Sequence, residues 1–428
     1  MSARRPAILA LAELLVATAL CASALAARPG YVRSFGHGGR RSLKPPKPPG
    51  VKELLYDEWL GTKDGSAYVL ANSECWGCGG PHQYLFKFDR RGRFDASFAG
   101  GRGYVELPGN GERTYALVVD RHGRALAVGD DHGSKVMRFT RAGRPDPRFG
   151  ERGVVRLPRL GKGILAPSPT VSSMPGGGLL VSVETPSEGH GFARFELEKL
   201  RENGTPFRGF GRAGMTAVDA AGSFHLEGGP TVMPDGSVLI VSTGLVQPVT
   251  LTRVSARGRL DTRYDRVARR ALRPLAALNS KLWEGLEAYV ALPRANGGVD
   301  LFGFGSPHGF DMRVEADGRA DVGFGRRGLK VLPLPVSGAT PLPGGEFLAT
   351  GNEFNQQTVA YVVRGDGTRD RRFRPTPLGH GSFGGNPVAI GDGLANVVYG
   401  IEIQQEENFH YRPVVARLAL PPTRRVVR

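Results

Sequence analysis

The chain repeats one short cassette seven times, and this repetition constrains its fold more than any other feature. The clearest copies are FDRRGRFDASFAGGRGYV at 88–105, FTRAGRPDPRFGERGVV at 139–155 and VEADGRADVGFGRRGLKV at 314–331. Weaker copies lie at 200–218, 254–272 and 363–378, and the aromatic residues of these six copies are Phe98, Phe149, Phe210, Tyr264, Phe324 and Phe373. A fixed period of this size indicates a repeat architecture in which each unit buries its apolar face against its neighbours.

A second cassette alternates with the first and reads as a β-hairpin. It is an apolar run, a glycine turn and another apolar run, as in YALVVDRHGRALAVGD at 115–130. Its turn glycines are Gly65, Gly123, Gly177, Gly236, Gly297, Gly345 and Gly393, with a mean spacing of about 55 residues. Glycine supplies the positive φ that a tight hairpin turn needs. Together the two cassettes predict four antiparallel strands per unit, which is a β-propeller blade.

The two ends of the chain carry complementary halves of one unit. Residues 33–39 (RSFGHGG) are a second half without a first, and residues 414–418 (VVARL) are a third strand without a fourth. We therefore predict an all-β, seven-bladed propeller of four-stranded antiparallel blades over 51–420, closed by an N-terminal strand that completes the last blade. Residues 27–50 then hold the closing strand and a Pro-rich linker. Only 275–288 suggests a helical turn.

The repeat resembles the delta-60 repeat family of bacterial surface and secreted proteins. The residues that carry the resemblance in the copy at 139 are Arg138, Gly143, Asp146, Phe149, Gly150 and Gly153. Those in the copy at 314 are Arg313, Asp317, Gly318, Asp321, Phe324, Gly325 and Gly328. The resemblance spans 31–420. It implies a β-propeller and no particular activity.

The N-terminus has the features of a secretory signal peptide over residues 1–26. Arg4 and Arg5 precede an apolar stretch, and Ala24-Leu25-Ala26 fits the small-x-small cleavage rule. We expect export, so the mature protein is extracellular or in the cell envelope, as a monomer. A retained membrane anchor is the alternative, and no later segment is apolar enough to span a bilayer. Residues 421–428 form a basic tail.

Cleavage leaves two cysteines, Cys75 and Cys78, in the sequence Cys-Trp-Gly-Cys. In an oxidising compartment this pair is expected to form a disulfide that closes a small surface loop. A thioredoxin-like redox site needs a strand-to-helix context that the sequence lacks here. Two cysteines are also too few for structural zinc, so no metal site is predicted.

Three charged features of the sequence each have two possible interpretations: the net charge, the repeated basic residues and the repeated aspartates. The net charge is +17, and only ten of the 57 basic residues are lysine, which fits either GC-rich coding or an anionic partner. Five units have a basic residue five positions before the glycine of the second turn, the one within the first cassette: Lys87, Arg138, Lys199, Arg253 and Arg313, with Arg417 as the equivalent. These residues form either an anion-facing ring or packing contacts between blades.

The aspartates three residues before the aromatic are Asp95, Asp146, Asp261, Asp321 and Asp370. They cap turns or contribute to calcium sites, although one Asp per blade supplies too few oxygens.

Histidines gather in the connections between the second and third strands of the units. They are His82, His132, His190, His308 and His410. Such connections share a face with the blade-to-blade connections, so we name His82, His132, His190, His308 and Trp76 as candidate ligand-binding residues. Ordinary turn chemistry explains the same residues equally simply.

No Gly-x-Ser-x-Gly elbow, His-Glu-x-x-His or phosphate loop is present, and no cofactor is predicted. The sequence favours a secreted, non-enzymatic scaffold that binds a protein, a glycan or an anionic envelope polymer. The alternative is a propeller hydrolase or lyase that acts on a sugar or lactone at the central channel, with paired acids from distant blades.

Overall fold

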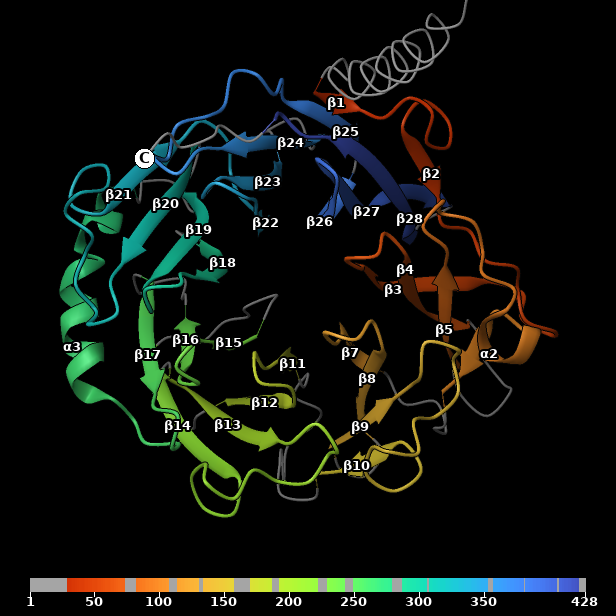
Figure 1. Ribbon diagram of the computed structural model, residues 1–428, viewed down its shortest axis with the longest axis horizontal. Coiled ribbons are helices and arrows are strands. Elements are labelled where there is room, and N and C mark those ends of the chain that lie inside the picture. Colours follow the sequence, from red (N-terminus) through yellow and green to blue (C-terminus); the bar gives the residue numbers. More distant parts are fainter. Residues whose placement is uncertain are drawn as a thin grey trace, which may run out of the picture.

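The structure, a computed structural model, is a ring of seven antiparallel sheets around a central axis (Figure 1). It describes residues 29–73, 82–107, 114–130, 134–157, 170–186, 192–221, 229–242, 249–278, 287–305, 308–352, 357–380, 382–405 and 408–422. The predicted seven-bladed propeller is confirmed. Candidates Trp76, Cys75, Cys78, His132 and His190, and the segments 1–26 and 423–428, lie outside the described residues.

Each blade is a meander whose first strand lies nearest the axis. Blade 1 holds β3 (Leu54–Gly61), β4 (Ala67–Ser73), β5 (Gln83–Phe88) and β6 (Tyr104–Glu106), with the short turn α2 (Phe98–Gly101). Blade 2 holds β7 (Thr114–Val119), β8 (Ala125–Asp130), β9 (Ser134–Arg138) and β10 (Val154–Arg156). Blade 3 holds β11 (Thr170–Ser173), β12 (Leu179–Pro186), β13 (Phe192–Leu200) and β14 (Met215–Ala221).

The remaining blades continue the ring. Blade 4 holds β15 (Thr231–Val232), β16 (Val238–Ser242) and β17 (Thr250–Val254), followed by α3 (Thr262–Ala271) and the 3₁₀ helix η1 (Arg273–Leu278). Blade 5 holds β18 (Glu287–Pro293), β19 (Val299–Gly305), β20 (His308–Val314) and β21 (Leu329–Leu332). Blade 6 holds β22 (Gly338–Pro341), β23 (Phe347–Asn352), β24 (Gln357–Val363) and β25 (Thr376–His380). Blade 7 holds β26 (Ser382–Gly391), β27 (Leu394–Gln405) and β28 (Asn408–Ala419).

The N-terminal segment completes blade 7, as predicted. The strand β1 (Gly30–Tyr31) pairs with β28 at Tyr31↔Leu418, and β2 (Arg40–Ser42) pairs with it at Arg41↔Val415. The loop between β1 and β2 carries Phe35, which is buried. The outer edge of β28 is therefore paired along its last residues, and this pairing removes an exposed sheet edge.

The hydrophobic core is divided into seven clusters, one at each seam between neighbouring blades. For example, Leu126, Val136 and Phe149 of blade 2 pack against Val171 and Val181 of blade 3. The last seam joins blade 7 to blade 1 through Phe35, Val398 and Val415 against Trp59 and Val69. Each blade thus buries both faces against its neighbours, as the repeat requires.

The repeated basic residues lie at these seams, which settles their role in favour of packing. Each stands over the aromatic ring of its own cassette, at 3.7 Å for Arg313–Phe324, 4.2 Å for Arg417–Phe35 and 4.4 Å for Arg138–Phe149. The corresponding distances are 4.5 Å for Lys199–Phe210, 5.1 Å for Arg253–Tyr264 and 5.7 Å for Lys87–Phe98. These are cation–π pairs within the ~6 Å range in which such attraction operates.

Most of these cations also donate to a backbone carbonyl in the second turn of the next blade. Lys87 reaches the carbonyl of Arg141 at 3.1 Å, and Arg253 reaches that of Ala316 at 2.8 Å. The corresponding acceptors are Glu202 for Arg138 and Arg90 for Arg417. The same turn accepts the aromatic ring of the preceding blade. At Gly143, with φ +76°, a Cβ would lie 2.7 Å from Cε2 of Phe98, so glycine is required there for two reasons.

The repeated aspartates cap turns, as the structural interpretation predicted. Oδ1 of Asp95, Asp146, Asp321 and Asp370 accepts the backbone N–H two residues further on, at 2.9–3.1 Å. Asp261 instead caps α3 by accepting the N–H of Tyr264 at 3.0 Å.

Blade 4 departs from the expected pattern, because α3 occupies the place of its fourth strand. In blades 2, 3, 5 and 7 the aromatic is followed by Gly-x-x-Gly, whose glycines take positive φ, as at Gly150 (52°) and Gly153 (93°). Here the sequence after Tyr264 is Asp-Arg-Val, which has no glycine to reverse the chain. Here the backbone continues as a helix, whereas in blade 6, which also lacks these glycines, Pro375 follows the aromatic and disfavours a helix. The helical turn expected at 275–288 is present only as the end of η1 in the described residues.

Candidate functional site

A four-stranded meander places its connections on two opposite faces of the ring. The turns between strands one and two and between strands three and four lie on one face, which we call the turn face. The connections between strands two and three lie on the other, which we call the loop face. The predicted binding residues belong to the loop face, and of these the structure describes His82 and His308.

His82 forms a polar pair on blade 1. Its Nδ1 lies 2.7 Å from Oε1 of Glu106, and both side chains are about half exposed. Its ring stacks on Tyr84, which in turn meets Tyr104 edge-on with ring centroids 5.6 Å apart. An imidazole, a carboxylate and two phenol rings therefore meet at the loop-face end of β5 and β6.

His308 begins β20 on blade 5, where it is exposed and pairs in register with Gly305. His82 and His308 belong to different blades, and the structure does not bring them together. Within the described residues, no three His, Cys, Asp or Glu side chains are close enough to hold a metal ion.

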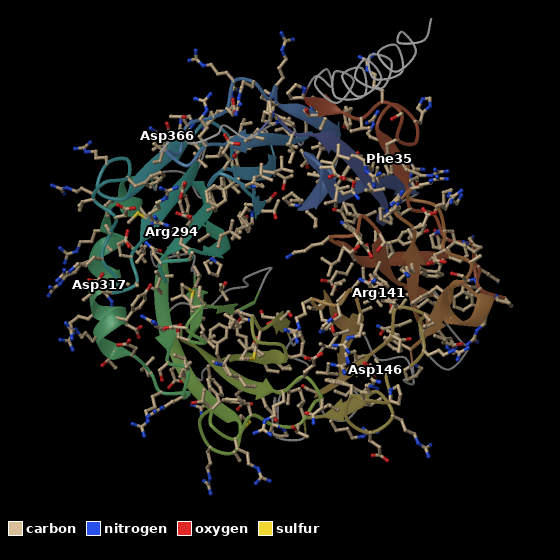
Figure 2. The ribbon with its side chains drawn as sticks, in the orientation of Figure 1. Phe35, Arg141, Asp146, Arg294, Asp317 and Asp366 are labelled. Atoms are coloured by element: carbon tan, nitrogen blue, oxygen red, sulfur yellow. The ribbon has the colours of Figure 1, made fainter. Side chains whose placement is uncertain are left out.

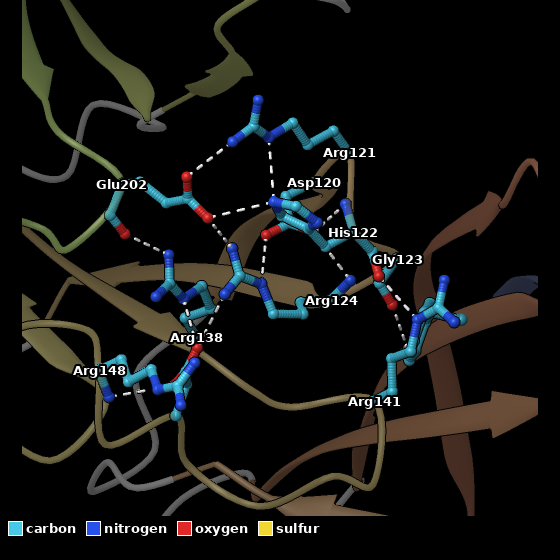
Figure 3. A network of polar contacts seen from close by, with 11 residues as sticks. Asp120, Arg121, His122, Gly123, Arg124, Arg138, Arg141, Arg148 and Glu202 are labelled. Atoms are coloured by element: carbon cyan, nitrogen blue, oxygen red, sulfur yellow. Dashed lines mark hydrogen bonds and ion pairs between the residues drawn. The ribbon is translucent and has the colours of Figure 1, made fainter. Parts of the chain in front are cut away.

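The turn face carries a polar pocket that sequence reasoning did not identify (Figure 3). It lies at the seam between blades 2 and 3, and Glu202 of blade 3 is its central acceptor. The Glu202 carboxylate is 2.8 Å from Nη2 of Arg121, 3.1 Å from Nη2 of Arg124 and 3.2 Å from Nε2 of His122. The other lining residues include Asp120, Arg138, Ser173 and Leu179.

Behind this pocket lies the most buried ion pair of the network, Arg138–Asp146. Nε of Arg138 is 2.9 Å from Oδ2 of Asp146, which also accepts Nη1 of Arg124 at 3.2 Å. Burial alone would raise the pKa of Asp146. The N–H of Arg148 and the charges of Arg138 and Arg124 outweigh that effect and lower the pKa below its usual value.

The network is specific to this seam. Glu202 stands two residues before its turn glycine, where blades 1 and 2 have Arg90 and Arg141. This reversal of charge was readable in the sequence and marks the seam where Arg121 and Arg124 need a partner. The cations and anions pair closely with each other, so the pocket's chemistry is that of a structural clamp.

Glu58 is a second residue that sequence reasoning missed. It lies on β3, the innermost strand of blade 1, beside a bulge between Tyr56 and Glu58. Its Oε2 accepts the N–H of Leu117 on β7, the innermost strand of blade 2. Burial, more than the neighbouring Asp57, raises the pKa of Glu58 to about 8. A carboxyl with a raised pKa is suited to act as a general acid near neutral pH.

Asp311 on β20 is the most unusual ionisable residue of the ring. It is fully buried, and neither carboxyl oxygen has a hydrogen-bond partner among the described residues. Burial first, and then the charge of Asp300, raise its pKa well above the ordinary value. The equivalent position, two residues before the repeated cation, is apolar in every other blade: Leu85, Val136, Leu197, Leu251, Ala360 and Val415.

We expect Asp311→Val to stabilise the protein at neutral pH and to have little effect in acid. Below the unfolded pKa of ~3.9, both states bind the proton and the buried carboxyl is neutral. As pH rises above that value the unfolded chain ionises while the folded one does not, so stability falls. Removing the group should therefore raise the free energy of unfolding by about 1–3 kcal/mol at pH 8, as measured by denaturant titration.

Asp300→Val is the matched control, because Asp300 is also buried but accepts Nε of Arg313 at 2.7 Å. Its loss leaves a buried guanidinium unpaired and should destabilise the protein. The interpretation of Asp311 is wrong if both variants destabilise at pH 8.

Comparison with known proteins assigns no family to the chain. No family model and no curated protein matches the chain. Among solved structures, the polysaccharide lyase Uly1 is 13% identical, with a TM-score of 0.45 over 85% of this chain and 90% of that one. The β-propeller domain of the Trilobed protease from Pyrococcus furiosus is 9% identical, with a TM-score of 0.45 over 86% and 94%. A protein from Dyadobacter fermentans is 10% identical, with a TM-score of 0.40 over 90% and 100%. At these values none of them bears on what this chain binds.

Proposed function

We propose that the chain is a secreted, non-enzymatic scaffold of the delta-60 repeat type that binds a protein, glycan or cell-envelope ligand on its loop face. One observation supports this above others, namely the half-exposed His82–Glu106 pair next to Tyr84 and Tyr104. An imidazole and a carboxylate offer both donors and acceptors, and the half-buried ring of Tyr104 can stack on a sugar or an apolar group, while the buried Tyr84 supports it from behind.

The structural roles of the repeated residues also support the proposal. The repeated cations, aromatics and aspartates are engaged in seams and turns, where they hold the ring closed. Residues that recognise a ligand must then come from outside the cassette, where the blades differ.

The described part of the chain has no helix long and apolar enough to cross a membrane.

The proposal predicts that a loop-face variant loses binding. A glycan array probed with the whole protein would supply ligands. The variant His82→Ala/His132→Ala/His190→Ala/His308→Ala should bind each of them about tenfold more weakly or worse, which is the loss of one or two good polar contacts. His37→Ala serves as the control, because His37 is exposed but lies in the closing loop between β1 and β2.

Two results would contradict it. Unchanged affinity in the four-histidine variant would remove the loop face from consideration. Binding that collapses between ~50 and ~200 mM salt in every variant would indicate diffuse attraction to the basic surface.

A hydrolase or lyase at the central channel is the second candidate, and the raised pKa of Glu58 is the observation that favours it. In that case the array glycans would be cleaved by the wild-type protein, and Glu58→Gln would abolish cleavage without changing the fold.

A further inference from the structure

The helix α3 presents a row of arginines to solvent on the outer rim of the ring. Its inner side is formed by Tyr264, Ala268 and Ala271, all buried, and Leu272 just after it is buried too. The opposite side carries four exposed arginines, which we call the outer arginine stripe: Arg263, Arg266, Arg270 and, at the start of η1, Arg273. Figure 1 shows α3 outside β17, and Figure 2 shows nitrogen-tipped side chains projecting outward along this rim.

The spacing of the stripe places its charges in line. The steps of three, four and three residues return to one side of a helix at each turn. At ~1.5 Å of rise per residue, four guanidinium groups follow one another over roughly 15 Å. In the part of the chain that the structure describes, the other blades have strands in this place, and none of them has a helix that carries such a stripe.

These arginines differ from those at the seams in having no anionic partner. Within the described residues, none of the four forms an ion pair. The acids of the helix are directed elsewhere, since Asp261 caps Tyr264 and Asp265 accepts the N–H of Arg253 at 2.8 Å. Like charges three and four residues apart repel one another and destabilise a helix. A bound polyanion would relieve this repulsion.

We propose that the outer arginine stripe binds a linear acidic polysaccharide through its uronate carboxylates. The inference rests on the proposed function, and it adds a ligand class and a surface distinct from the loop face. Guanidinium groups bind carboxylates through two parallel hydrogen bonds, and a row of them matches a polymer with regularly spaced charges.

The chemistry of the surface disfavours two other kinds of anionic partner, single-stranded nucleic acid and lipid. Single-stranded nucleic acids are held by aromatic rings on which bases stack, and the exposed side of α3 has none. A helix that binds lipid needs an apolar side free to enter the membrane. The apolar side of α3 is buried in the cluster that includes Met312 and Val314 of blade 5.

Binding of polygalacturonate to the whole protein at low salt tests the proposal. The variant Arg263→Gln/Arg266→Gln/Arg270→Gln/Arg273→Gln should bind at least about tenfold more weakly, as four exposed ion pairs together imply. The control is Arg144→Gln/Arg208→Gln/Arg326→Gln/Arg371→Gln, which removes the same charge from exposed arginines of four other blades. It should bind within about twofold of the wild type. Thermal melting of both variants checks that they fold. If the four-residue stripe variant does not fold, the single variant Arg266→Gln takes its place in the binding measurement.

Three outcomes would overturn the proposal. Equal losses in both variants would mean that net charge, not the stripe, attracts the polymer. An unchanged stripe variant would exclude α3. Tighter binding to duplex DNA or to anionic lipid vesicles than to polygalacturonate, lost with the stripe, would assign the surface to another partner. None of these depends on the loop-face histidines, so the proposed function can fail or stand independently.

Discussion

Deletion of residues 27–43 is expected to open the ring and leave a protein that aggregates. The segment supplies the strands that pair with β28, and its loss would expose the backbone of that edge to other chains. It also removes Phe35 and Leu43 from the core at the seam between blades 7 and 1. The loss of two such side chains lowers the free energy of unfolding by about 5 kcal/mol or more. The melting temperature should therefore fall by on the order of 10 °C.

Size-exclusion chromatography and thermal melting measure both effects. The double variant Phe35→Ala/Leu43→Ala keeps the strands and should lower the melting temperature without the aggregation. Arg33→Ala/Ser34→Ala changes exposed residues of the same segment and should do neither. A truncated protein that remains monomeric and melts normally would show that the closure is dispensable.

Blade 6 differs from the other blades at the position of the repeated cation. Blade 6 has Val362 where the others have Lys or Arg, and its aromatic, Phe373, is buried beside it. In four of the other blades the cation donates to a carbonyl in the second turn of the next blade, and Lys199 donates to Gly236 in the first turn of blade 4. Arg372 instead binds Asp370 and the carbonyl of Pro422.

Sequence reasoning reached the ring, the blade count and the closure because each depends on a local pattern that recurs. Turn glycines, the aromatic and the Asp cap are short-range features, and their positions along the chain fix the strands. The helix α3 was missed because the missing glycines after Tyr264 were interpreted as a degraded copy of the motif. Their absence instead marks a change of conformation, because the chain continues as α3 where the intact copies have positive-φ glycines.

The site residues were harder to predict, because they depend on contacts between blades. Nothing local to Glu58 reveals that it reaches Leu117 on the next blade. Asp311 was visible in principle, because an acid replaces an apolar residue at a repeated position. Aligning the copies by their third strands, and not only by their turns, would have exposed it. The same alignment shows Glu202 as a reversal of charge.

The buried pair Arg138–Asp146 should contribute most to the stability of the seam between blades 2 and 3. The two side chains are 4% and 5% exposed, so removal of the carboxylate in Asp146→Ala leaves a guanidinium without its counter-charge in the interior. Such losses cost about 3–5 kcal/mol. Denaturant titration of the variant against the wild type measures the difference in the free energy of unfolding.

Asp321→Ala is the matched control, because Asp321 occupies the same position in blade 5. It caps its turn in the same way, at Gly323, but its ion pair is with the more exposed Arg294. The basic residue of that blade, Arg313, is held by Asp300 instead. This variant should lose about 1 kcal/mol, from the cap and a partly exposed pair. Equal losses in the two variants would mean that the turn cap alone accounts for the repeated aspartate.

The pH dependence of the stability difference between the wild type and Asp146→Ala distinguishes the contribution of the ion pair from that of side-chain packing. The pKa of Asp146 is lowered in the folded protein, because the Arg148 N–H and two arginines outweigh burial. A depressed folded pKa gives stability that is fully present above the unfolded value of ~3.9 and is lost as pH falls through the folded value. The gap between the wild type and Asp146→Ala should therefore be constant from pH 8 to about 5 and narrow below about 4. A gap that persists unchanged in acid would assign the contribution to shape, because protonation neutralises the carboxylate without removing the side chain.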